Sequence, residues 1–372
     1  MTEQHNFNAG PSALPFAVKE SIHKAIDEIA GGPGILELSH RSRDFEYIIE
    51  GARESIKNLY QLPDSHEVLF LQGGASLQFA MIPLNLGSNV GFVTTGVWSE
   101  RAFAEAQRLT YSQETCPVEI STASPSFDRV FREITDPKGQ VFDRDYIHIT
   151  SNNTIYGTQY SALPTASMEG DTRALSNLVI DASSDIFSRP IDWSRVALLY
   201  AGAQKNAGPS GVTIVIVRKE ISRAAPRHPL CPKIMAYSTH AEKKSLYHTP
   251  NTLGVFAVGE VAKWVESLGG IEVMKQRSEK RSQRLYDLID RYEVYQGHAQ
   301  QASRSMMNIT FRVNDVLLEA EFLKRAKARS MWGLKGHRSV GGLRASMYNA
   351  VQDHSVDRLC ELLEEIGEEA SG

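Results

Sequence analysis

Short apolar runs alternate with helix-like segments through the first 220 residues of the chain. The runs have the length and apolarity of buried strands, and they span residues 67–71, 90–94, 146–149, 178–180, 196–200 and 212–217. Helix-like segments such as residues 98–109 separate several of them. This alternation is typical of α/β proteins, in which helices cover both faces of a mostly parallel sheet. We therefore expect an open α/β sheet.

The pattern of apolar and charged residues changes after about residue 250. A helical stripe that includes Phe256 and Val261 closes at Gly269-Gly270, and a charged stretch follows at 275–284, which predicts a solvated helix face. A strand-like run at 307–313, a helix-like segment at 317–328 and a final amphipathic helix complete the region. We expect a large domain over residues 15–255 and a smaller α+β domain over 256–372, joined by residues 1–14.

Composition excludes several classes of function. The formal net charge is -4, from 40 basic and 44 acidic residues, which argues against a nucleic-acid footprint or a polybasic membrane patch. The cysteines Cys116, Cys231 and Cys360 are widely separated, with no Cys/His metal spacing, and are expected to be free thiols. No signal-peptide pattern or membrane-length apolar run is present, so we expect a cytoplasmic protein without metal.

Two charged residues follow neighbouring strand-like runs, Asp181 after 178–180 and Lys205 after 196–200. Ligands of open α/β sheets lie beyond the carboxyl ends of strands. Taken alone, Asp181 is explained equally well as a loop cap, and Lys205 as an exposed loop lysine. The small residues around Lys205, however, allow close approach of a cofactor.

Burial would lower the pKa of Lys205 and free its amine to form an imine with an aldehyde. An acid such as Asp181 beside a pyridine nitrogen keeps that nitrogen protonated, so the ring can accept electrons from a breaking Cα–H bond. The pair therefore predicts a site for pyridoxal 5′-phosphate (PLP).

Four segments carry a resemblance to a known family. They are Asn6-Phe-Asn-Ala-Gly-Pro-Ser-Ala-Leu-Pro with Ser39-His-Arg-Ser-Arg, Ala-Gly-Ala-Gln-Lys205-Asn-Ala-Gly-Pro-Ser-Gly, and Gly336-His-Arg-Ser-Val-Gly-Gly-Leu-Arg-Ala-Ser-Met-Tyr-Asn-Ala. In this order they resemble phosphoserine aminotransferases, class V enzymes of PLP fold type I, over nearly the whole chain. The resemblance implies a mostly parallel large domain with a smaller α+β domain, and Lys205 as the Schiff-base lysine.

The resemblance also implies which residues hold PLP. A glycine-rich turn before a helix directs backbone N–H groups at an anion, and the family places the phosphate on this turn at Ala75 and Ser76. Trp98 would stack on the pyridine ring, and Thr154, Asp181, Ser183 and Gln204 would anchor the cofactor. His248 and Thr249 would reach the phosphate of the partner subunit, which implies a homodimer with shared sites. Some family members have arginine in place of Ser76, and asparagine is usual in place of His248.

Separate basic elements match the family's substrate sites. The resemblance assigns the substrate α-carboxylate to Arg344, and the distal carboxylate or phosphate to His40 and Arg41. His337 and Arg338 would join the distal site from the other subunit. Any one arginine is more often a surface residue, but guanidinium forks suit these anions.

The implied reaction is reversible transfer of an amino group from L-glutamate to 3-phosphohydroxypyruvate, which gives O-phospho-L-serine and 2-oxoglutarate in serine biosynthesis. 3-Hydroxy-2-oxo-4-phosphooxybutanoate, on the route to pyridoxine, is an implied second substrate.

Rivals within class V are alanine–glyoxylate and serine–pyruvate aminotransferases, which need no second cationic cluster, and cysteine desulfurases, which need a catalytic cysteine. A nucleotide-dependent oxidoreductase lacks support, because no Gly-x-Gly-x-x-Gly turn follows the first strand. A PLP-binding protein without catalysis is disfavoured by Lys205 and Asp181.

Overall fold

The computed structural model describes residues 3–87, 89–109, 118–121, 131–134, 136, 144–168, 171–174 and 176–372. Its largest sheet has the strand order β4-β14-β13-β12-β7-β5-β6. The bounds of these strands are β4 His66–Leu71, β5 Val90–Thr94, β6 Val118–Ser121, β7 Tyr146–Thr150, β12 Leu178–Asp181, β13 Val196–Gly202 and β14 Thr213–Arg218. Strand β14 runs antiparallel to both of its neighbours, whereas the other pairings are parallel. The expectation of a mostly parallel sheet is confirmed.

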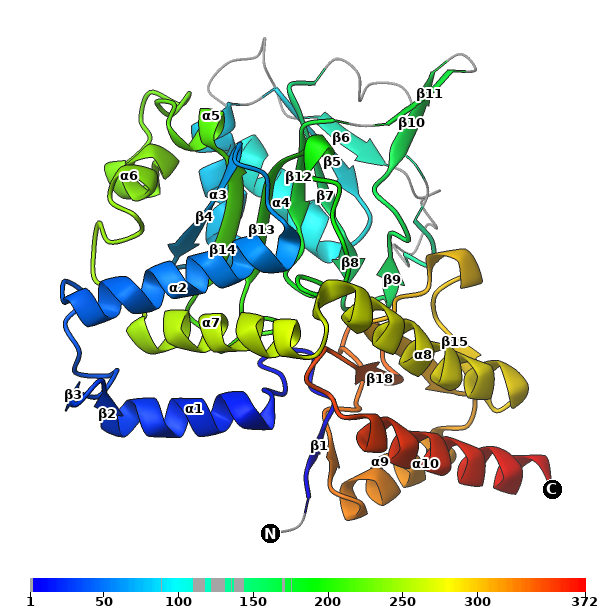
Figure 1. The fold of residues 1–372 in the computed structure, drawn as a ribbon. Helices are drawn as coiled ribbons and strands as arrows, with labels where there is room; N and C mark the ends of the chain where they lie inside the picture. The colour runs from blue at the N-terminus through cyan, green and yellow to red at the C-terminus, as the bar shows by residue number, and fades with distance from the viewer. Residues whose placement is uncertain are drawn as a thin grey trace.

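Helices cover both faces of this sheet (Figure 1). On one face lie α1 (Phe16–Asp27), α2 (Arg43–Tyr60) and α7 (Thr252–Ser267), whose apolar side chains share one buried cluster with the sheet. On the other face lie α3 (Gly74–Leu86), α4 (Val97–Arg108) and α6 (Tyr237–Glu242), which share a second cluster. The sheet is buried on both sides, which explains the continuous apolar runs in the sequence.

Helix α2 shows how the sequence sets an element's ends. The Ser42 hydroxyl at its N-cap accepts a hydrogen bond from the backbone N–H of Phe45, and Asp44 and Glu46 lie in the first turn, where negative charge is favourable. Gln61 ends the helix in the left-handed conformation. The cap places Arg41 just before the start of the helix.

The C-terminal residues form a smaller body, at the lower right of Figure 1. It contains α8 (Gly270–Arg291), β15 (Tyr295–Gly297), β16 (Asn308–Val313), α9 (Val316–Ala328), β17 (Met331–Trp332), β18 (Leu343–Ser346) and α10 (Asp353–Ser371). Strands β15, β16 and β18 form an antiparallel sheet, and β1 (His5–Asn6) pairs with β17. The N-terminal strand therefore joins this body, and Phe7 lies in its core.

The expected domain boundary at residue 255 falls inside α7. That helix packs against α1 and α2, and its side chains belong to the core of the large domain as far as Val265. The first side chains of α8, Ile271 and Met274, belong to the same core, whereas Leu285 belongs to the core of the small domain. We propose that the boundary lies within α8.

The charged stretch 275–284 does not form a fully solvated helix face. Arg281 is 3% exposed, and its Nε donates to Asp353 Oδ1 over 2.6 Å at the start of α10. Ser278 and Ser282 are also buried. Because α10 packs along α8, one side of this stretch lies at a helix–helix contact that its charge did not reveal.

The remaining elements are short: β2 (Glu28–Ile29), β3 (Gly32–Pro33), β8 (Asn152–Asn153), β9 (Thr158–Gln159), β10 (Thr165–Met168), β11 (Asp171–Ala174) and α5 (Lys219–Ser222). Hairpin β8–β9 lies between the carboxyl end of β7 and the small domain, where the side chain of Asn152 donates to that of Asn308. None of the helices described here has the length and apolarity needed to span a membrane.

Candidate active site

The carboxyl ends of four parallel strands meet at one edge of the sheet. Strand β12 ends at Asp181, β13 leads to Lys205, β7 leads to Thr154, and β5 leads to Trp98 at the start of α4. Parallel pairing brings these ends together although they are far apart in sequence. The strand ends therefore form a polar site from residues that the sequence had placed after separate strands.

Asp181 is held in a fixed orientation by Ser183. The Ser183 hydroxyl donates to Asp181 Oδ1 over 2.6 Å, and the Ser183 N–H donates to the same oxygen over 3.0 Å. The hydroxyl also accepts a hydrogen bond from the Gly202 N–H. Burial raises the pKa of Asp181, while nearby Lys205 and the two hydrogen bonds lower it. In this structure the Ser183 side chain therefore orients the Asp181 carboxylate by hydrogen bonding.

Lys205 is closely surrounded. Its Nζ lies 5.4 Å from the centre of the Trp98 ring, and the backbone carbonyl of Lys205 accepts a hydrogen bond from the Ser12 hydroxyl. A Cβ added at Gly10 would lie 3.1 Å from Lys205 Cγ. Burial lowers the pKa of the Lys205 amine, Asp181 opposes this effect, and Arg344 adds to it. The surroundings therefore favour a neutral amine.

A chain of contacts joins Trp98 to the small domain. The indole Nε1 of Trp98 donates to Thr154 Oγ1 over 3.2 Å, and Arg344 Nη1 donates to the Thr154 carbonyl over 3.0 Å. Arg344 Nε is buried and has no hydrogen-bond partner among the described residues. Part of the Arg344 fork is therefore available to an anion.

A glycine turn leads from β4 into α3 beside these strand ends. Gly73 has φ of 92°, and a Cβ there would lie 2.6 Å from the Leu77 side chain, so only glycine fits. Ala75 and Ser76 lie in the first turn of α3, where backbone N–H groups have no intrahelical acceptor. The turn can bind an anion as the sequence predicted.

Three basic residues lie together on the small-domain side of the site. The pKa of His337 is lowered by partial burial, by Arg344 and Arg338, and by Arg101 of α4. Within its own chain His337 lies in the electrostatic field of Arg344. Its expected role in the site of the other subunit stays a prediction. His337 Nδ1 also hydrogen-bonds the Ser339 hydroxyl over 2.7 Å.

His40 and Arg41 lie before α2, and their side chains make no hydrogen bond or ion pair with any residue in the described ranges. His248 and Thr249 lie near the glycine turn of their own chain, where Gln72 Nε2 donates to the Thr249 carbonyl over 3.5 Å. The Gln204 carbonyl accepts a hydrogen bond from the Ser12 N–H. The side chains of Arg41 and Thr249 therefore have no hydrogen-bond or ion-pair partner among the described residues.

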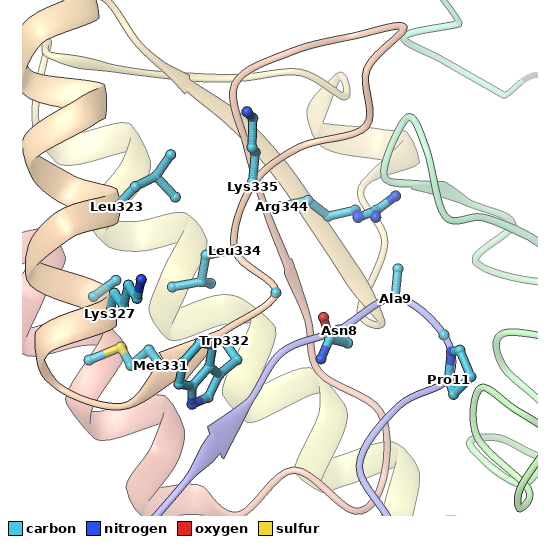
Figure 2. A pocket seen from close by; sticks show the side chains of 13 residues that line it. Asn8, Ala9, Pro11, Leu323, Lys327, Met331, Trp332, Leu334, Lys335 and Arg344 are labelled. Atoms are coloured by element: carbon cyan, nitrogen blue, oxygen red, sulfur yellow. The ribbon is translucent and has the colours of Figure 1, made fainter.

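A cavity of about 690 Å³ lies on the small-domain side of the segment Asn8–Pro11. Figure 2 shows residues that line it, among them Arg344 on β18, Lys335 between β17 and β18, and Lys327 on α9. Gly10 lines this cavity and also lies against Lys205, and Arg344 lines the cavity as well. No cluster of three or more metal-ligating side chains occurs among the residues described.

Comparison with known proteins identifies the family. Residues 4–359 match the family described as aminotransferase class-V. A phosphoserine aminotransferase of Lysinibacillus sphaericus is 47% identical over 371 residues, which are 98% of each chain. The chain belongs to the class V aminotransferases, in the phosphoserine aminotransferase family.

Solved members of the phosphoserine aminotransferase family have the same fold. One, described for radiation damage of its Schiff base, has a TM-score of 0.89 at 40% identity and covers 99% of this chain and 100% of its own. The PLP-bound phosphoserine aminotransferase of Trichomonas vaginalis has a TM-score of 0.86 at 30% identity, over 97% of this chain and 100% of its own. The expectations of family and fold are confirmed.

Two residues of the site were not singled out from the sequence. Gly10 lies in the matched N-terminal segment, but only its position against Lys205 shows why a side chain is excluded there. Arg101 lies 5.0 Å from the centre of the Trp98 ring, three residues further along α4. Its spacing of i, i+3 from Trp98 was the one signal available, since such residues share a helix face.

Proposed function

We propose that this aminotransferase binds PLP and transfers the amino group of L-glutamate reversibly to 3-phosphohydroxypyruvate, which gives O-phospho-L-serine and 2-oxoglutarate. The observation that carries the proposal is the buried pair of Asp181 and Lys205 at neighbouring strand ends, with the amine of Lys205 facing the ring of Trp98. The relatives at 40–47% identity named phosphoserine aminotransferase support the substrate class.

The residues fit PLP at each of its polar ends. Asp181 would face the ring nitrogen with its charge stabilised by the hydrogen bond from Ser183, and the N–H groups of Ala75 and Ser76 would face the phosphate. Trp98 offers an aromatic face, and the Thr154 hydroxyl beside it is available to a ring oxygen. When bound, PLP supplies an electron-accepting ring that stabilises the charge left when the substrate Cα–H bond breaks.

Lys205 would act as the general base and then the general acid. The lowered pKa of its buried amine favours the neutral form, in which Nζ can take a proton from the substrate Cα and then deliver it to C4′ of the cofactor. Asp181 keeps its charge near enough to stabilise the protonated amine between these two transfers. The close wall formed by Gly10 and Trp98 limits where Nζ can move.

The cationic groups would orient two dianionic substrates in turn. Arg344, with its unpartnered Nε, would take the α-carboxylate, because Thr154 already fixes the guanidinium plane. His40 and Arg41, joined by His337 and Arg338 from the other subunit, would take the distal carboxylate or phosphate. The same groups suit 3-hydroxy-2-oxo-4-phosphooxybutanoate, which we propose as a second amino acceptor.

We further propose a cytoplasmic homodimer in which His248 and Thr249 reach the PLP phosphate of the partner's site, and His337 and Arg338 join the partner's distal-anion site. The side chains of Arg41 and Thr249, which have no hydrogen-bond or ion-pair partner among the described residues, are available for these shared sites. The free thiols of Cys231 and Cys360 are in accord with a reducing compartment.

Absorption spectra of the PLP-loaded enzyme test the reaction. We expect glutamate to convert the band of the lysine-bound cofactor to that of the aminated cofactor, and 3-phosphohydroxypyruvate to restore it. Restoration by pyruvate or glyoxylate, but not by the phosphorylated acid, would contradict the proposed substrate. Lys205→Ala should lose the adduct that borohydride fixes to the wild-type lysine, and the rate should fall by at least about 10³-fold.

Subunit mixing tests the shared site. Lys205→Ala and Thr249→Val should each impair the homodimer, but in a mixed dimer one site carries both changes and the other carries neither. Random mixing should therefore recover about a quarter of wild-type activity. No recovery beyond the sum of the two parents would place Thr249 in the site of its own chain.

A further inference from the structure

Behind Asp181, two buried polar side chains form a hydrogen-bonded pair that the reaction described above does not use. His148 Nε2 lies 2.8 Å from the Tyr200 hydroxyl, and both residues are fully buried. They come from β7 and β13, the two strands that flank β12, so the bond crosses the strand that carries Asp181. A pair of this kind costs desolvation free energy that an apolar pair would avoid.

Strand register brings this pair to the cofactor's carboxylate. Tyr200 is the direct partner of Asp181 in the parallel β12–β13 pairing, and His148 is the partner of Val179, two residues before Asp181 on the same face. Burial raises the pKa of the Tyr200 hydroxyl, and Asp181 beside it raises that pKa further, as expected where the hydroxyl donates to the carboxylate. The order of contacts is therefore His148, Tyr200, Asp181.

The position of the one imidazole proton decides the direction of these hydrogen bonds. His148 Nδ1 has no hydrogen-bond partner among the described residues, whereas Nε2 faces the Tyr200 oxygen. A proton on Nδ1 would be a buried unpaired donor, which costs about 1–3 kcal/mol. Burial lowers the pKa of His148 to about 3, so the ring stays neutral and carries its single proton on Nε2. His148 then donates to the Tyr200 oxygen, and the Tyr200 proton is left for Asp181.

We propose that His148 and Tyr200 are positioning residues that direct a hydrogen bond at the Asp181 carboxylate and thereby hold the proton on the PLP ring nitrogen. The inference rests on the proposed function, because it assigns Asp181 to that nitrogen. A donor to the charged carboxylate makes it less basic, so it takes the ring proton less readily. The His148 N–H polarises the Tyr200 hydroxyl and strengthens this effect.

The other groups that face Asp181 cannot replace this donor. Lys205 faces it from the end of β13 and Asp185 from its own loop, while its partner on β7, Thr150, is uncharged. Ser183 donates to Oδ1 from the loop that follows β12. Among the residues that the structure describes, Tyr200 is therefore the donor that lies beside the carboxylate from the interior of the sheet.

The test is the ¹⁵N chemical shift of the ring nitrogen in enzyme loaded with ¹⁵N-labelled PLP. We expect a protonated nitrogen in the wild type and a shift towards the unprotonated value in Tyr200→Phe. The glutamate half-reaction should slow by about 10- to 100-fold, as expected for loss of a hydrogen bond to a charged group. The same Tyr200→Phe change in an Asp181→Asn background should leave the shift unaltered.

Tyr237→Phe is the matched control. It removes another fully buried hydroxyl from the same apolar cluster, one that donates to Gln78 Oε1 over 2.8 Å. We expect its ring-nitrogen shift to equal that of the wild type. An unchanged shift in Tyr200→Phe, with stability reduced as in Tyr237→Phe, would leave the pair a purely structural contact and overturn the inference.

The tautomer of His148 provides a test that needs no variant. Histidine-labelled enzyme should show the proton of His148 on Nε2, exchanging slowly with solvent. A proton on Nδ1 would mean that Tyr200 donates to His148 and not to Asp181, which overturns the inference even if Tyr200→Phe fails to fold. Failure of the wild type to bind PLP would instead contradict the proposed function, so the two failures are distinguishable.

Discussion

The amine of Lys205 faces the indole of Trp98, with Nζ 5.4 Å from the ring centre. Lys205 comes from the end of β13 and Trp98 from the start of α4, so the relationship depends on how β13 and β5 are placed in one sheet. Trp98 is fixed in turn by its hydrogen bond to Thr154. The contact brings the reactive amine and the aromatic wall of the site to one place.

The first prediction concerns Gly10, whose φ of +142° and closeness to Lys205 both require glycine. Gly10→Ala should push Lys205 from its position and reduce the turnover rate about 10- to 100-fold, in line with the effect of small misplacements at reacting groups. Steady-state kinetics with glutamate would show this as a fall in kcat.

Gly51→Ala is the control for this prediction. A Cβ at Gly51 meets nothing within 4 Å, and the residue lies inside α2, where alanine is favoured. We expect normal kinetics and a slightly higher melting temperature. Equal rates for Gly10→Ala and the wild type would show that the N-terminal segment does not confine Lys205.

The second prediction concerns Ser183, whose hydroxyl donates to Asp181. Ser183→Ala should raise the pKa of Asp181 further, because the charged form loses a hydrogen bond, and should slow the glutamate half-reaction about tenfold. Stopped-flow absorption would measure the rate. Ser184→Ala, which instead removes a bond to the Asn152 carbonyl, should leave the half-reaction at its wild-type rate. Equal slowing in both variants would argue against a specific role for Ser183.

The third prediction concerns the guanidinium of Arg344. Arg344→Lys keeps the charge but loses the fork that Thr154 orients, so KM for glutamate should rise about 10- to 100-fold while the cofactor spectrum is preserved. Arg312→Lys is the control, because that arginine is exposed on the neighbouring strand β16. A KM for Arg344→Lys within twofold of the control would contradict its role in carboxylate binding.

The fourth prediction concerns the pH dependence of stability. The pKa of His148 is about 3 in the fold, against 6.5 for a free side chain, so below pH 6.5 the unfolded chain binds a proton that the folded chain does not. The contribution of His148 to the free energy of unfolding is therefore complete above pH 6.5, and it is lost as the pH falls from 6.5 towards 3. Between pH 7 and pH 5 the loss should be roughly 2 kcal/mol.

Urea midpoints at pH 7 and pH 5, at fixed protein and PLP concentrations, measure this loss. His148→Gln should be less stable at pH 7 but should lose less on acidification than the wild type. His23→Gln, on the exposed side of α1, should follow the wild-type dependence. Parallel behaviour of His148→Gln and the wild type would show that His148 does not titrate as its burial implies.

Local periodicity determined much of the fold. The strands β4, β5, β7, β12, β13 and β14 and the helices α4, α7 and α9 lie within a few residues of their expected ranges. The reason is that a buried face requires apolar residues to recur along the sequence at the period of the strand or helix. The charge of residues 275–284 wrongly predicted a solvated face, because packing of α10 against α8 buries Arg281.

The sequence by itself placed Asp181 and Lys205 at strand ends, and the family motifs named the residues around them. Only the tertiary structure decided that Gly10 confines Lys205 and that His148 meets Tyr200 across β12. The physical reason is range: periodicity and motifs report on neighbours along the chain. Contacts between residues 50 or 190 positions apart depend on strand order and register, which form only when the whole sheet assembles.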